Sequence, residues 1–63
     1  MARMFALHGW VMLNNKDFVQ EYGEGPYQIQ SIDRKDDGQE PEKLHLCVGG
    51  SVVSIPARFC QFY

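Results

Sequence analysis

The segment Leu44-His45-Leu46-Cys47-Val48-Gly49-Gly50-Ser51-Val52-Val53-Ser54-Ile55 decides the fold of this chain. Two runs of β-prone residues flank a pair of glycines, and two-residue hairpin turns need positive φ angles that glycine adopts without steric cost. Side chains alternate across a strand, so the apolar residues of both runs share one face: Leu44, Leu46, Val48, Val53 and Ile55. The segment predicts a β-hairpin with an apolar inner face, and with His45 and Cys47 on the opposite face.

A second strand is predicted upstream of this hairpin, over residues 27–32, after a turn that contains Gly25 and Pro26. Its alternation predicts that Tyr27 and Ile29 point inward. Between this strand and the hairpin lies the polar stretch 33–43, which contains Asp36-Asp37-Gly38 and Pro41. Charged residues with glycine and proline favour an exposed loop that ends the strand.

A short strand is predicted near each end of the chain. Residues 10–13 form an apolar run that Asn14-Asn15 stops, and residues 4–7 either extend or precede it. Residues 16–22 are interpreted as part of a long irregular loop, although their aromatic residues have the spacing of one helical turn. Near the carboxyl end, Pro56-Ala57-Arg58 predicts a one-turn 3₁₀ link, and residues 59–63 resume β character.

Length and charge limit the classes of function. The chain has 63 residues, which is enough for one domain spanning 1–63, and a net charge of −2 with a pI near 5.5. Most nucleic-acid affinity comes from basic residues that release counterions from the phosphates, and this chain has no overall positive charge. A nucleic-acid partner therefore ranks second to a protein partner. Two cysteines without CxxC spacing, and no long apolar run, predict a reduced, cytoplasmic protein with no membrane segment.

The order of these elements resembles an SH3-like barrel: five short antiparallel strands, a long loop after strand 1, a glycine hairpin and a 3₁₀ turn before the last strand. The segment 54–62 resembles the closing segment of SH3 domains, in which a proline and an aromatic residue enclose the 3₁₀ turn. Residues 10–63, with Gly25-Pro26 before a strand and Val48-Gly49-Gly50 before the proline turn, look like small bacterial SH3-like proteins of the YodC type. The resemblance implies an all-β, five-stranded barrel.

In SH3 domains the proline and aromatic of the closing segment help to bind polyproline peptides, and Pro56 and Phe59 match these positions. By the same resemblance, Asp17, Glu21 and Glu24 take the place of the acidic residues that meet the ligand. The family's tryptophan pair has no counterpart at Lys43-Leu44-His45. Type II dihydrofolate reductase is similar at Ser51-Val52 and Pro56-Ala57, but its pore-lining residues are replaced in this chain, so no site residue carries over.

The residues that could carry chemistry favour a structural use. His45 and Cys47, with Cys60 and His8, could supply mixed zinc ligands, but a structural zinc site normally brings together two close pairs, and only one such pair exists. A Cys/His nucleophile also needs an orienting group and an oxyanion pocket, which the sequence does not indicate. We therefore predict no catalytic residue, no metal and no cofactor, and a protein that is not an enzyme.

The aromatic residues give the functional prediction. There are eight, more than so small a core can enclose, so some should face outward and form an interface with another protein. The alternative is that Trp10, Tyr27 and Phe59 are core residues and the others cover the barrel ends. We predict a non-catalytic protein-interaction module, such as a small adaptor or inhibitor. The alternatives are a small barrel that associates with nucleic acid or the ribosome, and a homo-oligomeric ligand-binding barrel that resembles type II dihydrofolate reductase. Its expected partner-binding residues are Phe18, Tyr22, Pro56 and Phe59.

Overall fold

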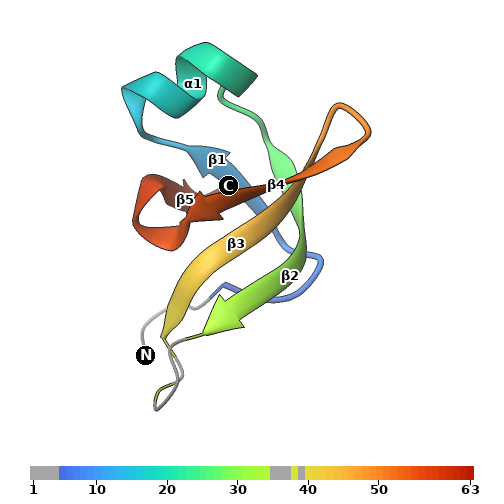
Figure 1. Cartoon of the computed structure of the whole chain (residues 1–63), viewed down its shortest axis with the longest axis vertical. Helices are drawn as coiled ribbons and strands as arrows, with labels where there is room; N and C mark the ends of the chain where they lie inside the picture. Colours follow the sequence, from blue (N-terminus) through green and yellow to red (C-terminus); the bar gives the residue numbers. More distant parts are fainter. Residues whose placement is uncertain (1–4, 35–37, 39) are drawn as a thin grey trace.

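The computed structural model describes residues 5–34, 38 and 40–63. Its strands are β1 (Trp10–Leu13), β2 (Tyr27–Arg34), β3 (Pro41–Val48), β4 (Ser51–Pro56) and β5 (Cys60–Phe62), joined by helix α1 (Lys16–Tyr22) and the 3₁₀ turn η1 (Ala57–Phe59) (Figure 1). All neighbouring strands are antiparallel, and the sheet order is β4-β3-β2-β1-β5. The predicted all-β class is confirmed, as an open sheet with edges at β4 and β5.

The predicted hairpin is present with the predicted turn. Leu44 pairs with Ile55 and Leu46 with Val53, and Gly49 and Gly50 have φ angles of 56° and 85°. Two positive φ angles define a type I′ turn, whose twist matches that of the strands it joins. Leu44, Leu46 and Ile55 are fully buried, as expected from the alternation. Val48 and Val53 are half-buried, because Val48 adjoins the turn and Val53 lies on an edge strand.

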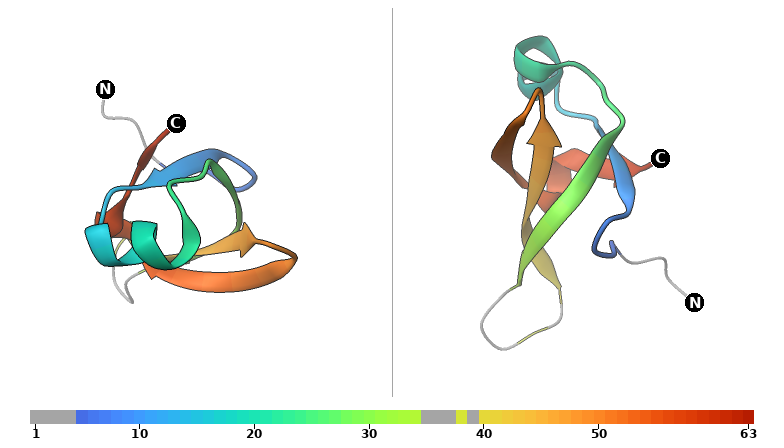
Figure 2. Two further views of the ribbon diagram at one scale, coloured as in Figure 1. Left: turned by 90° about the horizontal axis from the view of Figure 1, so that it is seen from above. Right: turned by 90° about the vertical axis from the view of Figure 1, so that its right-hand side faces the viewer.

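Strand β2 connects the two halves of the sheet. It pairs with β1 through Tyr27 and Gln28 and with β3 from Ile29 onward, and the register shifts between Ile29 and Ser31. Such irregularities bend a strand, so the sheet curves over its own apolar face. Figure 2 (left) shows β1 across the core from the β3–β4 hairpin. Eight residues from β1 to β5 fill the core between them: Val11, Leu13, Ile29, Leu44, Leu46, Ile55, Ala57 and Cys60.

The prediction of a long irregular loop after the first strand was wrong, because residues Lys16–Tyr22 form α1. The Asn15 side chain caps this helix by accepting hydrogen bonds from the backbone N–H groups of Asp17 (3.0 Å) and Phe18 (3.3 Å). The Phe18 ring packs against Phe59, with 5.5 Å between ring centroids. A helix this short is marginal by itself, so the contact with η1 and the cap together account for it.

The polar loop between β2 and β3 is shorter than predicted. Asp33 and Arg34 extend β2, and Pro41 to Lys43 belong to β3, where Pro41 pairs with Arg34. Proline is tolerated as the first residue of a strand, so it does not end the sheet here. The predicted loop residues Asp36 and Asp37, and Met4 at the amino end, lie outside the described residues.

At the carboxyl end the predicted 3₁₀ link is confirmed as η1, and the last strand begins at Cys60, one residue later than expected, because Phe59 completes the turn. Of the two residues expected to point inward from β2, Ile29 is buried, whereas Tyr27 is half-buried. The Tyr27 hydroxyl donates to the carbonyl of Tyr22 at 2.5 Å, so its ring lies under the end of α1. No helix in the described part of the chain is long and apolar enough to cross a membrane.

Candidate functional site

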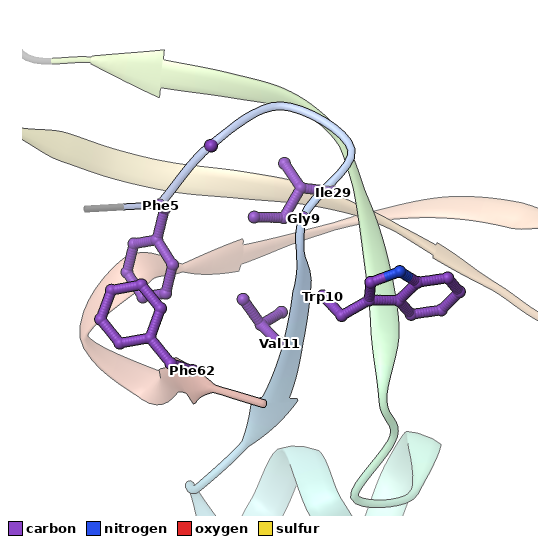
Figure 3. Close-up of a pocket in the computed structure, with 7 residues that line it drawn as sticks. Phe5, Gly9, Trp10, Val11, Ile29 and Phe62 are labelled. Carbon is purple, nitrogen blue, oxygen red and sulfur yellow. The ribbon is translucent and has the colours of Figure 1, made fainter. Parts of the chain in front are cut away.

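A cavity of about 230 Å³ opens between the segment before β1 and strands β1, β2 and β5 (Figure 3). Every residue that lines it is apolar: Phe5, Ala6, Gly9, Trp10, Val11, Ile29 and Phe62. Val11 and Ile29 are fully buried core residues, so the open part of the cavity lies above the core and is bordered by the other five lining residues. The lining side chains are apolar and polar backbone atoms contribute part of the surface, so a space of this size suits one apolar group of a ligand or partner.

The side chains of Phe5 and Phe62 form one wall of the cavity, and Trp10 borders it on strand β1. The rings of Phe5 and Phe62 pack together with 4.6 Å between their centroids and 31° between their planes. Figure 3 shows these two rings beside Val11, whereas the indole of Trp10 lies on the other side of β1 and points away from them. Trp10 is 50% exposed. Large aromatic side chains that are only partly covered supply much of the contact area of protein interfaces.

Backbone hydrogen bonds hold the segment before β1 against β2. The N–H of His8 donates to the carbonyl of Ile29 at 2.9 Å, and the N–H of Ile29 donates to the carbonyl of Gly9 at 2.8 Å. The segment also turns tightly, since the N–H of Gly9 donates to the carbonyl of Ala6 and a Cβ at Gly9 would lie 3.0 Å from that oxygen. The cavity is therefore formed before any partner binds.

Further exposed apolar side chains adjoin the cavity in the chain. Leu7 follows the lining residue Ala6 and is 55% exposed, and Tyr63 follows the lining residue Phe62 and is 68% exposed. The N–H of Tyr63 donates to the carbonyl of Trp10 at 3.4 Å, which holds the end of the chain beside β1. Leu7 and Tyr63 are thus exposed apolar neighbours of lining residues in the sequence, and we call the cavity and its lining residues the aromatic site.

Three of the four partner-binding residues predicted from the sequence, Phe18, Tyr22 and Phe59, lie together where α1 packs on η1, away from the aromatic site. Phe18 stacks on Tyr22 with 6.4 Å between ring centroids, and it packs on Phe59. The guanidinium carbon of Arg58 lies 4.7 Å from the centroid of the Phe59 ring. All three aromatic residues are half-buried and pack against the core, and Pro56, also half-buried, ends β4 opposite Lys43. Much of their surface is used within the fold.

Sequence reasoning did not find the aromatic site. The alternative that Trp10 belongs to the core is wrong, because Val11 and Leu13 take the inward positions of β1 and leave Trp10 pointing outward. The alternation of side chains within residues 10–13 already indicated that Trp10 and Val11 face opposite sides of the strand. No local pattern indicated that Phe5 and Phe62 meet, since they come from opposite ends of the chain.

The outer face of the sheet carries a line of polar contacts. Ser54 Oγ lies 2.7 Å from His45 Nδ1, and His45 Nε2 lies 2.9 Å from Asp33 Oδ2. Serine, histidine and aspartate in hydrogen-bonded order also occur in hydrolases, but nucleophilic catalysis further requires oxyanion donors and a bound substrate. None of these three residues lines the cavity. The contacts are those of side chains on neighbouring strands.

The two cysteines have different surroundings. Cys47 is exposed on the outer face, whereas Cys60 is buried in the core, and burial raises the pKa of its thiol to about 11. Cys60 therefore lies away from Cys47 and His45, the residues on the outer face that were considered as zinc ligands with it. Among residues 5–34, 38 and 40–63, no group of three or more histidine, cysteine, aspartate or glutamate side chains is placed to hold a metal ion.

Comparisons of the chain with family models, with curated proteins and with solved structures gave no match.

Proposed function

We propose that this chain is a non-catalytic protein-interaction module that receives an apolar side chain of a protein partner in the aromatic site. The observation that carries the proposal is the preformed cavity above Val11 and Ile29, with the Phe5 and Phe62 rings at its wall and half-exposed Trp10 at its border. Interface energy concentrates in a few large side chains that enter pockets, with tryptophan and tyrosine over-represented among them. A single anchor residue of the partner would fill this space.

The proposal includes an SH3-like barrel as the finer description of the fold. Three features support it: β2 pairs in both halves of the sheet, η1 separates β4 from β5, and β1 pairs with β5. Small barrels of this kind are filled by their own side chains, so they bind partners on their outer surface. An aromatic site at one end of the sheet agrees with that arrangement.

The surface predicted from the sequence, around Phe18, Tyr22, Pro56 and Phe59, is the second candidate for partner contact. Its residues are half-buried, and its aromatic residues pack against the core. It therefore offers less free apolar area than the aromatic site. Variants at both places allow one experiment to separate them.

The test is a selection of peptides from a random displayed library on the immobilised, full-length chain, followed by titration of the selected peptides in solution. Trp10 is the only tryptophan, so its fluorescence reports directly on the aromatic site. We expect the selected peptides to share one large apolar residue. Trp10→Ala and Phe62→Ala should weaken their binding by about tenfold or more, as truncation of an anchor contact does.

The controls are Tyr22→Ala, at the second candidate surface, and Val52→Ala, at an exposed position on β4. Both should bind the peptides like the wild type. If Tyr22→Ala abolishes binding and Trp10→Ala does not, the partner surface is the one predicted from the sequence. If the library yields only peptides that bind all four variants equally, or if binding is found only to RNA or DNA and is lost at high salt, the proposal fails.

A further inference from the structure

Strand β4 (Ser51–Pro56) is a free edge of the sheet. It pairs with β3 on one side, and no described strand pairs with its other side. Among the residues that the structure describes, no backbone hydrogen bond from a turn, loop or cap reaches β4. An edge strand of this length presents a row of backbone donors and acceptors that another strand can use.

The register of the hairpin identifies which peptide groups point outward. In a two-residue hairpin the pair that flanks the turn is a hydrogen-bonded pair, which here is Val48 with Ser51, and hydrogen-bonded pairs then recur at every second residue. Residues 51, 53 and 55 therefore direct their N–H and C=O groups toward β3. The peptide groups of Val52 and Ser54 point away from the sheet.

This edge lacks the protection that monomeric sheets carry. Soluble proteins guard edge strands with lysine and other charged residues, bulges or proline. Residues 51–56 contain no charged residue, the β3–β4 register is unbroken, and the single proline is the last residue of the strand. Val52, at the middle of the outward row, is 62% exposed.

We infer that β4 pairs with β4 of a second copy of this chain, antiparallel and about a two-fold axis at Val53, to form a homodimer with one continuous sheet. The outward peptide groups at 52 and 54 lie symmetrically on either side of residue 53. In this register, Val52 of each copy forms a hydrogen-bonded pair with Ser54 of the other. The edge is thus complementary to itself.

A second copy suits this edge better than a charged partner strand. The strand brings no like charges together, and pairing covers the two apolar side chains that the monomer leaves open, Val52 and half-buried Val53. Dimers with a two-fold axis use the same patch on both subunits, which this register requires. The aromatic site lies at β1 and β5, at the other end of the sheet order, so it stays open in the dimer.

The experiment is sedimentation velocity of the full chain over a wide concentration range, with reductant present so that exposed Cys47 forms no disulfide. We expect a reversible monomer–dimer equilibrium. Val52→Lys places two like charges on diagonal positions of the joined strands, and Val52→Pro removes an outward N–H without removing a bond to β3. Each should raise the dissociation constant by about tenfold or more.

The matched control is Cys47→Lys. Cys47 is exposed and lies directly opposite Val52 on β3, so it carries the same new charge one strand farther from the edge. This variant should dimerise like the wild type, as should Trp10→Ala at the aromatic site. Circular dichroism of each variant checks that the sheet is retained.

Hydrogen exchange of the wild-type chain tests the register without any substitution. In the monomer the amides of Val52 and Ser54 point to solvent, and in the dimer they are bonded, so their exchange should slow as concentration rises while that of the Gly50 amide in the turn stays fast. A chain that remains monomeric at millimolar concentration, or a dimer in which these amides stay unprotected or Val52→Lys has no effect, would overturn the inference. Because it involves a different edge, its failure leaves peptide binding at the aromatic site untouched.

Discussion

Ser54 and His45 face each other across the β3–β4 ladder, and the hydroxyl oxygen of Ser54 lies 2.7 Å from Nδ1 of His45. They form a non-hydrogen-bonded pair, in which the side chains approach most closely. On its other ring nitrogen, His45 contacts Asp33 of β2. One side chain thus connects three strands on the outer face of the sheet.

Replacing Ser54 with alanine should reduce the free energy of unfolding by about 0.5–1 kcal/mol, the usual net contribution of a partly exposed hydrogen bond or cross-strand pair. Urea denaturation followed by circular dichroism measures the change. Ser51→Ala is the control, since Ser51 is an exposed serine on the same strand, opposite Val48. Equal losses in both variants would mean that the contact with His45 contributes nothing.

Replacing Leu46 with alanine should strongly destabilise the chain. Leu46 is fully buried between the halves of the sheet, and such truncations cost about 2–5 kcal/mol. For a domain of this length the total stability is about 3–9 kcal/mol. Thermal unfolding should show a large drop in the midpoint temperature for Leu46→Ala and almost none for Val52→Ala. A small effect at Leu46 would contradict the placement of this residue in the core.

Replacing Asn15 with alanine should destabilise α1. Its side-chain oxygen accepts from two backbone N–H groups that have no partner within the helix, and loss of such a cap costs about 0.5–2 kcal/mol. The amides of Asp17 and Phe18 should then exchange faster. Asn14→Ala is a matched control, because Asn14 uses its backbone N–H, which donates to the Phe59 carbonyl and survives the change. Identical exchange in the two variants would argue against the cap.

The two thiols should differ in reactivity. Iodoacetamide at pH 8 should modify exposed Cys47 quickly and buried Cys60 only after unfolding in urea, which mass spectrometry of the digested protein distinguishes. The raised pKa of Cys60 also makes folding sensitive to alkali. Between its ordinary value of 9.0 and the folded value of about 11, the unfolded chain releases this proton first.

Stability linked to Cys60 is therefore fully present below pH 9 and is lost as the pH rises toward 11. Cys60→Ala should show a weaker dependence of unfolding free energy on pH in this interval than the wild type. An unchanged slope, or rapid modification of Cys60 in the folded protein, would contradict its burial. Cys47→Ala, at the exposed position, serves as the control.

The sequence predicted the parts of the fold that depend on neighbours in the chain. The hairpin needs two alternating runs and a glycine pair, all within residues 44–55, and its register is as expected. Helix α1 was missed because seven residues carry a weak local signal, and its packing partner Phe59 lies about forty positions away. The aromatic site was missed for the same reason: its lining residues include Phe5, Trp10 and Phe62, which come from opposite ends of the chain.

The pairing of β1 with β5 has a consequence for synthesis on the ribosome. Val11 meets Phe62 and Leu13 meets Cys60, so the first strand to emerge is completed by the last. Until residues 60–62 leave the exit tunnel, β1 has a bare flank and the space beside Phe5 lacks a wall. Contacts between such distant segments form slowly. A nascent chain whose residues 60–62 are still inside the exit tunnel should therefore be protease-sensitive and unable to bind the selected peptides. A longer tether that brings these residues out should make the chain protease-resistant and able to bind.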